Sequence, residues 1–219
     1  MTLLGPPHGG KSEPDVARAV HGLVLAAGRG SRFGGSKLHA PYRGRPLLSH
    51  ALSVVRTACE RGLLGAGHAV IERSDDVALG LVNAANLHPI INDAPGRGIS
   101  RSLRLGLGSI EGVPGVAAAL VFLGDQPRVR VDVIEALIAA WGGSCAVVRP
   151  RYSLQPDAPG HPVLLPRPVW PRAAQLEGDS GFSALLGGAS TETLLVDVLG
   201  DNPDVDTLAD FQRLEGYSV

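Results

Sequence analysis

The feature that most constrains the fold of this chain is a regular alternation, from His21 onward, of short apolar runs with longer segments of helical periodicity. This alternation is typical of a mostly parallel sheet with helices on both faces. We therefore expect an α/β fold: a Rossmann-like, three-layer α/β/α sandwich with a mostly parallel central sheet. The expected strands are 23–26, 69–72, 89–92, 118–123, 146–149, 163–165 and 194–198. The expected helices are 47–59, 75–86, 100–109, 131–140, 181–186 and 207–214.

Residues 1–20 differ from the rest of the chain. They are rich in Gly, Pro, Ser and charge and show no apolar period, which predicts a flexible N-terminal tail. We expect residues 21–219 to form a single domain, because no linker or repeat interrupts the alternation.

The segment GPPHGGKS, residues 5–12, matches the phosphate-binding P-loop pattern. That pattern works only between a buried strand and a helix. Four residues are too few for the strand, and Pro14 would interrupt the helix at its first turn. We therefore interpret this match as part of the tail.

Charge and aromatic content argue against nucleic-acid and membrane partners. The 20 Lys and Arg residues against 21 Asp and Glu give a net charge of −1, which provides no field to attract polyanions. The four Phe, two Trp and three Tyr residues are too few for the stacking platforms that hold single strands. Any bound nucleotide should be a small one.

The cysteines and the apolar runs indicate a location. Cys59 and Cys145 have no partner at a metal-ligand or disulfide spacing, which fits a reducing compartment. No apolar run reaches the ~20 residues of a membrane span, and the N-terminus lacks signal-peptide features. We expect a cytoplasmic protein.

A glycine-rich loop follows the first expected strand. The segment GRGSRFGGSK, residues 28–37, contains four glycines and three cations. Glycine has no Cβ and tolerates positive φ, so the backbone amides of such a loop can approach phosphate oxygens closely. Arg32 and Lys37 bring positive charge to the same place. The loop predicts a phosphate site at the carboxyl end of the sheet, with a flexible loop of solvated cations as the alternative.

The spacing of Gly28, Gly30 and Gly34 also resembles a dinucleotide fingerprint, so a nicotinamide-dependent oxidoreductase is a second interpretation. That fingerprint opens a helix directly and is followed by an acidic residue ~20 positions later. Here residues 41–46, with two prolines, precede any helix, and Glu72 comes too late. Phosphate binding is therefore favoured.

Five segments in order carry a resemblance to a known family. They are LAAGRGSRFGGSK with RGRPLLSHAL, NDAPGRGISRSLRLG, LGDQP, GHPV with GDSG, and DVDT with LADF. Together, over residues 21–212, they resemble the MobA-like nucleotidyltransferases, and within that family the molybdenum cofactor cytidylyltransferases. The reaction that this implies joins CMP from CTP to the terminal phosphate of a molybdopterin-type acceptor and releases pyrophosphate.

The resemblance also implies a role for individual residues. The catalytic residues would be Arg32, Lys37 and Asp125, and Mg²⁺ would be held by Asp125 and Asp206. The nucleotide would contact Leu25, Ala26, Ala27, Gly28, Gly30, Ser31, Arg32, Lys37, Asn92, Gly98 and Ser102. The acceptor would contact Gln126, Pro127, His161, Gly178 and Asp179.

These residue types suit the chemistry. The attacking phosphate is already ionised, so no general base is needed. The site must instead align the reactants and neutralise charge on the phosphates, which Mg²⁺, Arg32 and Lys37 would do. Mg²⁺ usually takes only one or two protein carboxylates. Asp125 and Asp206 also fit ordinary turn or helix-cap aspartates, and His161 fits a packed histidine.

Two positions depart from the family pattern and leave the acceptor open. Phe182 and Ser183 stand where a small residue and an arginine are common, and Arg101 replaces a usual serine. Other functions consistent with the chain are a transferase with another acceptor, an oxidoreductase on the same fold, or a chaperone that hands molybdenum cofactor to a molybdoenzyme. Lys37 and Asp125 favour an enzyme. Ala27, where the guanine-using branch has glycine, favours CTP.

Overall fold

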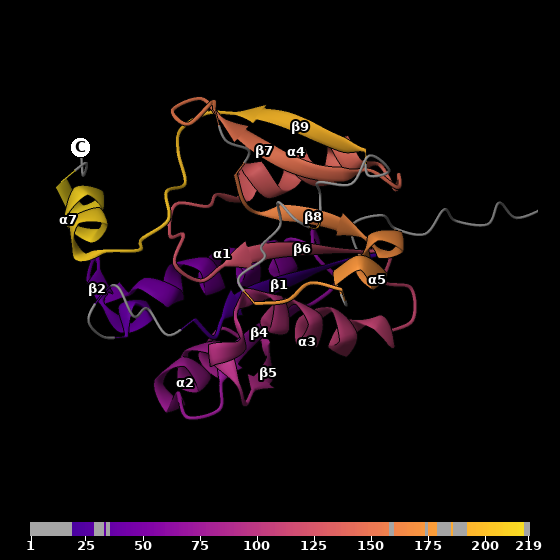
Figure 1. Ribbon diagram of the computed structural model, residues 1–219. Coiled ribbons are helices and arrows are strands. Elements are labelled where there is room, and N and C mark those ends of the chain that lie inside the picture. The colour runs from indigo at the N-terminus through magenta and orange to yellow at the C-terminus, as the bar shows by residue number, and fades with distance from the viewer. Residues whose placement is uncertain are drawn as a thin grey trace, which may run out of the picture.

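A computed structural model describes residues 19–28, 33, 36–157, 160–173, 175–178, 185 and 192–216. A seven-stranded sheet with the order β5-β4-β1-β6-β8-β7-β9 forms the centre of the fold (Figure 1). Its strands are β1 (Val20–Ala26), β4 (Gly67–Glu72), β5 (His88–Asn92), β6 (Ala118–Leu123), β7 (Val147–Tyr152), β8 (Val163–Pro166) and β9 (Thr193–Val198). The predicted mostly parallel α/β fold is confirmed, since only β8 among these strands runs antiparallel to its neighbours.

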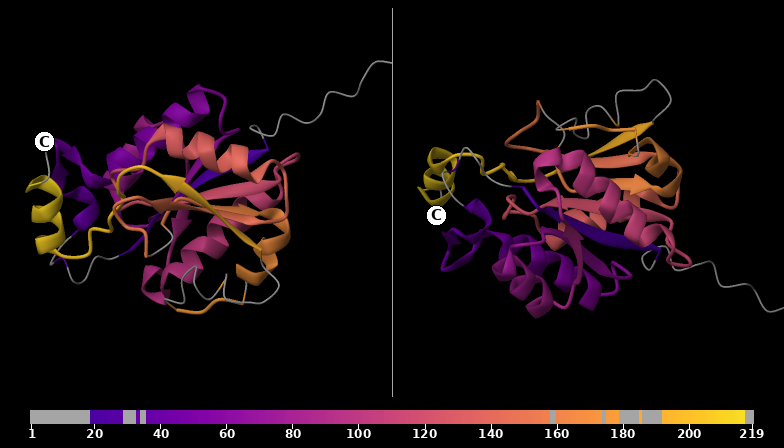
Figure 2. Two further views of the ribbon diagram at one scale, coloured as in Figure 1. Left: turned by 90° about the horizontal axis from the view of Figure 1, so that it is seen from above. Right: turned by 60° about the horizontal axis from the view of Figure 1, so that its bottom comes forward.

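The helices cover both faces of this sheet, as the two views of Figure 2 show. Those that do so are α1 (Leu47–Glu60), α2 (Asp76–Ala84), α3 (Ile99–Glu111), α4 (Val131–Trp141) and α5 (Trp170–Ala173), whereas α7 (Leu208–Gly216) lies beyond one end of the sheet. Short 3₁₀ turns occupy η1 (Lys37–His39), η2 (Pro95–Arg97) and η3 (Arg167–Val169), and β2 (Pro41–Tyr42) pairs with β3 (Arg45–Pro46) in a small hairpin.

Alternation along the strands sends side chains into two apolar layers. In β1, Val24 and Ala26 join the cluster under α1, α2 and α4, whereas Leu23 and Leu25 join the cluster under α3 and α5. Both faces of the strand are therefore buried, which explains why the sequence of β1 is apolar throughout its second half. Gly106 lets α3 approach β1 closely, because a Cβ there would lie 2.5 Å from Leu23 Cδ2.

A third cluster lies apart from these two layers. Tyr42, Leu47, Val205, Phe211 and Leu214 form it. It connects the β2–β3 hairpin and the start of α1 with α7 near the C-terminus, and Figure 1 shows α7 beside β2. We refer to it below as the third cluster.

Three histidines form a row across neighbouring strands at the amino-terminal edge of the sheet. His21 Nδ1 lies 3.1 Å from His68 Nε2, and the ring centroids of His68 and His88 are 5.1 Å apart. Burial, together with the charges of His21 and His88, lowers the pKa of His68 to about 4. His68 is therefore neutral at pH 7 in the folded protein.

Several element boundaries differ from the predictions. Val20 belongs to β1 and pairs with Ala118, so the first strand begins one residue before the expected domain boundary at residue 21. β7 continues to Tyr152 because it pairs with β9 along its length. Residues 1–18, with the P-loop-like segment, and residues 181–184 and 186 of the expected helix 181–186 lie outside the described residues.

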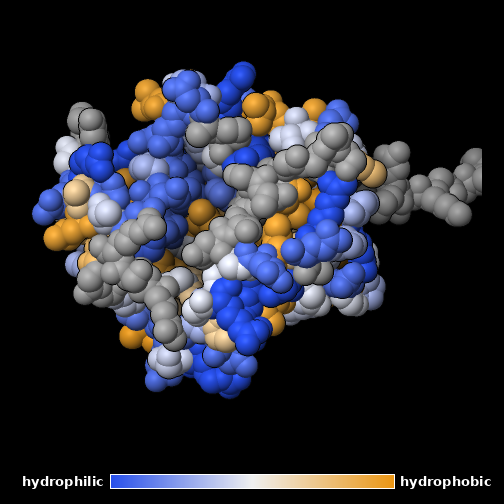
Figure 3. Space-filling view, in the orientation of Figure 1, coloured by the Kyte–Doolittle hydropathy of each residue, from blue (hydrophilic) through white to orange (hydrophobic). Residues whose placement is uncertain are grey.

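Among the described helices none is long and apolar enough to cross a membrane. The face seen in Figure 3 is mostly hydrophilic, with apolar residues dispersed among polar ones. Single exposed apolar residues of this kind are normal on globular proteins.

Candidate active site

A cavity of about 520 Å³ opens at the carboxyl edge of the sheet, within the size range of small-molecule sites. It lies where β1 and β6 end, beside the start of α3, which is the edge at which ligands of parallel sheets bind. Its lining is Leu25, Ala26, Ala27, Gly28, Lys37, Leu38, Pro95, Gly96, Gly98, Ile99, Ser102, Leu123, Asp125 and Asp206. Nine of the residues predicted to contact nucleotide or metal are therefore brought together here.

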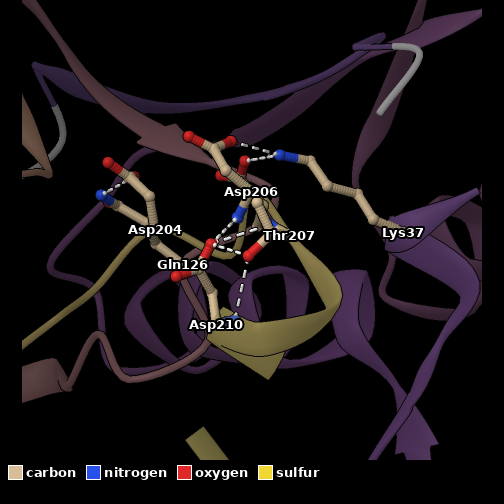
Figure 4. Close-up of polar contacts among 7 residues, drawn as sticks. Lys37, Gln126, Asp204, Asp206, Thr207 and Asp210 are labelled. Atoms are coloured by element: carbon tan, nitrogen blue, oxygen red, sulfur yellow. Dashed lines mark hydrogen bonds and ion pairs between the residues drawn. The ribbon is translucent and has the colours of Figure 1, made fainter. Parts of the chain in front are cut away.

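Lys37 lies between two carboxylates in this cavity (Figure 4). Its Nζ is 2.5 Å from Asp125 Oδ2 and 3.0 Å from Asp206 Oδ1. The Lys37 side chain is 11% exposed and that of Asp125 17%, but that of Asp206 is 54% exposed. Burial acts to lower the pKa of Lys37, but the two carboxylates outweigh it and raise this pKa. The ammonium group is therefore charged at neutral pH.

The backbone explains how Asp125 comes to this position. Asp125 follows the buried strand β6, and the neighbouring Gly124 N–H donates to Leu25 O at 3.0 Å, which joins the ends of β6 and β1. A Cβ on Gly124 would lie 3.0 Å from Leu48 and 3.2 Å from the Ala26 Cβ. Glycine at this position thus lets the turn lie close to β1.

Thr207 and Asp210 cap the start of α7, so the side chain of Asp206 is not needed there. Asp210 Oδ2 accepts hydrogen bonds from the backbone N–H of Thr207 at 2.8 Å and from its hydroxyl at 2.7 Å. The Thr207 hydroxyl accepts in turn from the Asp210 N–H at 3.1 Å. This is the reciprocal arrangement of a capping box. The Asp206 carboxylate therefore reaches toward Lys37 instead of capping the helix (Figure 4).

The two carboxylates fit a divalent cation. A single ammonium nitrogen already contacts both of them, so they lie close enough for one cation to bridge. No cluster of three His, Cys, Asp or Glu side chains suited to a metal occurs in the part of the chain that the structure describes. Two carboxylates nevertheless suffice for Mg²⁺, which fills its other positions with water and phosphate oxygens.

Comparison with known proteins places this geometry in a family. A family model described as the MobA-like NTP transferase domain matches residues 22–194. The chain belongs to this family. The membership predicted from the five segments is confirmed, and the match spans β1 to the start of β9 in the MobA-like transferase.

Individual relatives agree on the family and differ in their named roles. The transferase is 26% identical to the purine catabolism protein PucB of Bacillus subtilis, over 88% of this chain and 94% of that protein. It is also 26% identical to the molybdenum cofactor cytidylyltransferase of Escherichia coli, with the same coverages. The crystal structure of Rv0371c from Mycobacterium tuberculosis in complex with manganese has a TM-score of 0.75 and 27% identity, and covers 91% of this chain and 99% of that chain.

Asn92 holds the loop before α3 in place. It is fully buried, and its Oδ1 accepts from Ala94 N and from Arg101 Nε, both at 3.0 Å. Its Nδ2 donates to Ser102 Oγ at 3.0 Å. The amide that we predicted to contact nucleotide therefore bonds inside the protein. Gly98, with φ +85°, then begins α3 in a backbone conformation that favours glycine.

Three residues predicted to contact the acceptor, Gln126, Pro127 and His161, do not line this cavity. Gln126 is 4% exposed, and its amide bonds to Asp204 and Asn202. Pro127 is buried next to it. Burial and the nearby charge of Arg149 lower the pKa of His161 to about 3, so this histidine is neutral at pH 7.

The structure leaves part of the predicted site undescribed. Gly178 O accepts from Ser100 N at the start of α3 at 3.3 Å. Gly30, Ser31, Arg32 and Asp179 lie outside the described residues, so their roles stay predictions.

Sequence reasoning missed two polar residues beside the site. Asn202, 4% exposed, and Asp204 both bond to Gln126. Desolvation and the neighbouring charge of Asp125 raise the pKa of Asp204 above its usual value. Asp204 stands two positions before Asp206 in the closing segment, which was the available signal, whereas nothing in the sequence singles out Asn202.

Proposed function

We propose that this MobA-like nucleotidyltransferase transfers CMP from CTP to molybdopterin or a closely related acceptor, with Mg²⁺ as cofactor and pyrophosphate as product. The observation that carries this proposal is the pair of carboxylates bridged by Lys37 inside a nucleotide-sized cavity. The family supports nucleotidyl transfer, and the cytidylyltransferase relative supports the choice of CTP and acceptor.

The residues of the chain divide the work. Asp125 and Asp206 would hold Mg²⁺, which supplies positive charge to the phosphates of the nucleotide. Lys37 leaves its contact with the carboxylates and neutralises charge that develops on the α-phosphate and the leaving pyrophosphate. Arg32 belongs to the same proposal as a second cation. No residue needs to remove a proton from the acceptor, because a phosphate is ionised at neutral pH.

We assign the choice of base to Ala27. Ala27 is 4% exposed and lines the cavity with Leu25, Ile99 and Ser102. In this proposal the Cβ of Ala27 takes space that a two-ring purine would need and leaves room for a one-ring pyrimidine. Exclusion of this kind, with one buried polar group left unpaired, is worth roughly 2–4 kcal/mol. CTP should therefore bind one to a few powers of ten more tightly than GTP.

The first experiment identifies the nucleotide. Thermal shifts are measured with CTP, UTP, ATP and GTP, each with Mg²⁺, and NADPH is included for the oxidoreductase alternative. A ligand at a hundred times its dissociation constant stabilises by ~2.7 kcal/mol. CTP should give the largest shift, and Ala27→Gly should narrow the gap between CTP and GTP. A preference of the unmodified protein for GTP would overturn the choice of CTP and leave nucleotidyl transfer intact.

The second experiment identifies the acceptor. Pyrophosphate release from CTP is followed with and without molybdopterin, with Asp125→Asn as the inactive control. Release that depends on molybdopterin supports the proposal. Binding of molybdopterin without release would point instead to a carrier that passes the cofactor to a molybdoenzyme. Release only with a different acceptor would fit a role nearer that of the purine catabolism relative.

A further inference from the structure

The side-chain amides of Gln126 and Asn202 connect the two segments of the chain that carry the carboxylates at the site. Asp125 and Gln126 lie in the turn after β6, and Asn202 and Asp204 lie in the segment that leads from β9 to Asp206. These segments are 74 or more positions apart in sequence. Their relative position therefore depends on the contacts between them.

The contacts form a chain of hydrogen bonds. Gln126 Nε2 donates to Asp204 Oδ1 at 2.5 Å, and Gln126 Oε1 accepts from Asn202 Nδ2 at 3.0 Å. Figure 4 shows Gln126 and Asp204 facing each other beside Asp206. Both ends of the Gln126 amide are thus used, so its orientation is determined.

Asn202 joins this chain to further elements. Its Oδ1 accepts from the Arg128 N–H at 3.2 Å, and its Nδ2 also donates to His161 O at 3.2 Å. Its own N–H donates to Gln155 Oε1 at 3.2 Å. Asn202 is 4% exposed, and a buried polar group that loses its partner destabilises the fold. The segment before α7 is therefore held against the turn after β6.

We propose that Gln126 and Asn202 are positioning residues that fix the separation of Asp125 and Asp206 and thereby set the affinity of the site for its metal ion. This inference rests on the proposed metal role of the two aspartates. It replaces the predicted acceptor contact of the Gln126 side chain, because that side chain contacts Asp204 and Asn202 instead. Residues that orient metal ligands in this way typically change metal affinity or activity 10- to 100-fold when substituted.

The test measures metal binding rather than turnover. Mn²⁺ is titrated into the full-length protein and followed by electron paramagnetic resonance, with CTP affinity measured separately in EDTA. Gln126→Met keeps the size of the side chain and removes both hydrogen bonds. We expect its Mn²⁺ dissociation constant to rise about 10-fold or more, with CTP affinity in EDTA unchanged.

A matched control separates positioning from general loss of stability. Trp170 is buried in α5 on one face of the sheet, and its Nε1 donates to Leu165 O at 3.0 Å. Trp170→Phe removes this buried hydrogen bond without touching the chain of amides. It should lower the melting temperature and leave Mn²⁺ affinity as in the wild type. Equal Mn²⁺ affinity in Gln126→Met and the wild type would overturn the proposal.

A double substitution tests the hydrogen bond itself. In Gln126→Glu with Asp204→Asn, donor and acceptor exchange places: the amide introduced at position 204 donates to the carboxylate introduced at position 126. Asn202 can still donate to an oxygen of that carboxylate. The total charge is unchanged. Mn²⁺ affinity should recover toward the wild-type value relative to Gln126→Met, whereas no recovery would refute the role of this bond. Failure of the wild type to bind Mn²⁺ would instead overturn the metal assignment itself, and this inference with it.

Discussion

Replacing Lys37 by methionine should have opposite effects on stability and on metal affinity. Methionine keeps an unbranched apolar stem but lacks the ammonium group that lies 2.5 Å from Asp125 and 3.0 Å from Asp206. Removing one partner of a buried ion pair costs about 3–5 kcal/mol, and an exposed pair is worth at most about 1 kcal/mol. Asp125 is 17% exposed and Asp206 54%, so we expect a loss of about 3 kcal/mol in the metal-free protein.

The same substitution should make the metal bind more tightly. In the wild type a cation that enters must displace Lys37 from both carboxylates, whereas in the variant it meets two uncompensated negative charges. We expect Mn²⁺ affinity to increase about tenfold or more, which corresponds to about 1.4 kcal/mol. Turnover should nevertheless fall by about 10²- to 10³-fold, because the cation that neutralises phosphate charge is gone.

The assay combines urea denaturation in EDTA with a calorimetric Mn²⁺ titration of the same preparation. Lys11→Met, in the P-loop-like segment, is the control and should change neither quantity. A variant as stable as the wild type in EDTA, or one that binds Mn²⁺ more weakly, would refute the view that Lys37 is the counter-charge of the two aspartates.

Three further predictions concern the acidic site, the histidine row and the contact between α3 and β1. Asp125→Asn should keep the fold, because Asp206 still pairs with Lys37, but should reduce kcat by about 10²- to 10³-fold, measured as pyrophosphate release. The pKa of His68 is lowered to about 4 in the fold, so the unfolded chain takes up a proton there first and stability falls as the pH drops from 6.5 toward about 4. The wild type should lose about 3 kcal/mol of stability between these pH values through His68, and His68→Gln should not show this loss, as measured by urea denaturation at each pH. Gly106→Ala should destabilise by about 1–3 kcal/mol because its Cβ would collide with Leu23. Gly108→Ala in the same helix, where nothing lies within 4 Å, should instead stabilise by up to about 1 kcal/mol in the same denaturation experiment.

The strands of the sheet were predicted well because each of them is marked in the sequence by a short apolar run. The apolar runs at 118–123 and 163–165 coincide with β6 and β8 within a residue. The direction of β8 has no comparable signal, since an apolar strand buried on both faces has the same composition in either direction. The antiparallel pairing of Val121 with Val163 thus became visible only in the structure.

The candidate site was predictable where chemistry depends on residue type. Lys37, Asp125 and Asp206 were singled out from the sequence, and the structure brings them together. The contacts of Asn92 and Gln126 were not predictable, because a buried amide that bonds to protein and an amide that binds a ligand have the same sequence signature. Only the partners of each side chain distinguish the two.

Because of the third cluster, Asp206 is held in place by a more lightly packed element than Asp125. Asp125 follows β6 in the middle of the sheet, whereas Asp206 precedes α7, whose Phe211 and Leu214 pack only into this small cluster among the three apolar clusters of the described residues. Proteins open first at such lightly packed elements, at a free energy below that of global unfolding. The apparent affinity for any ligand that needs both aspartates is reduced by the fraction of molecules with α7 docked. Packing at Phe211 therefore tunes ligand binding at a distance, without any change in the lining of the cavity.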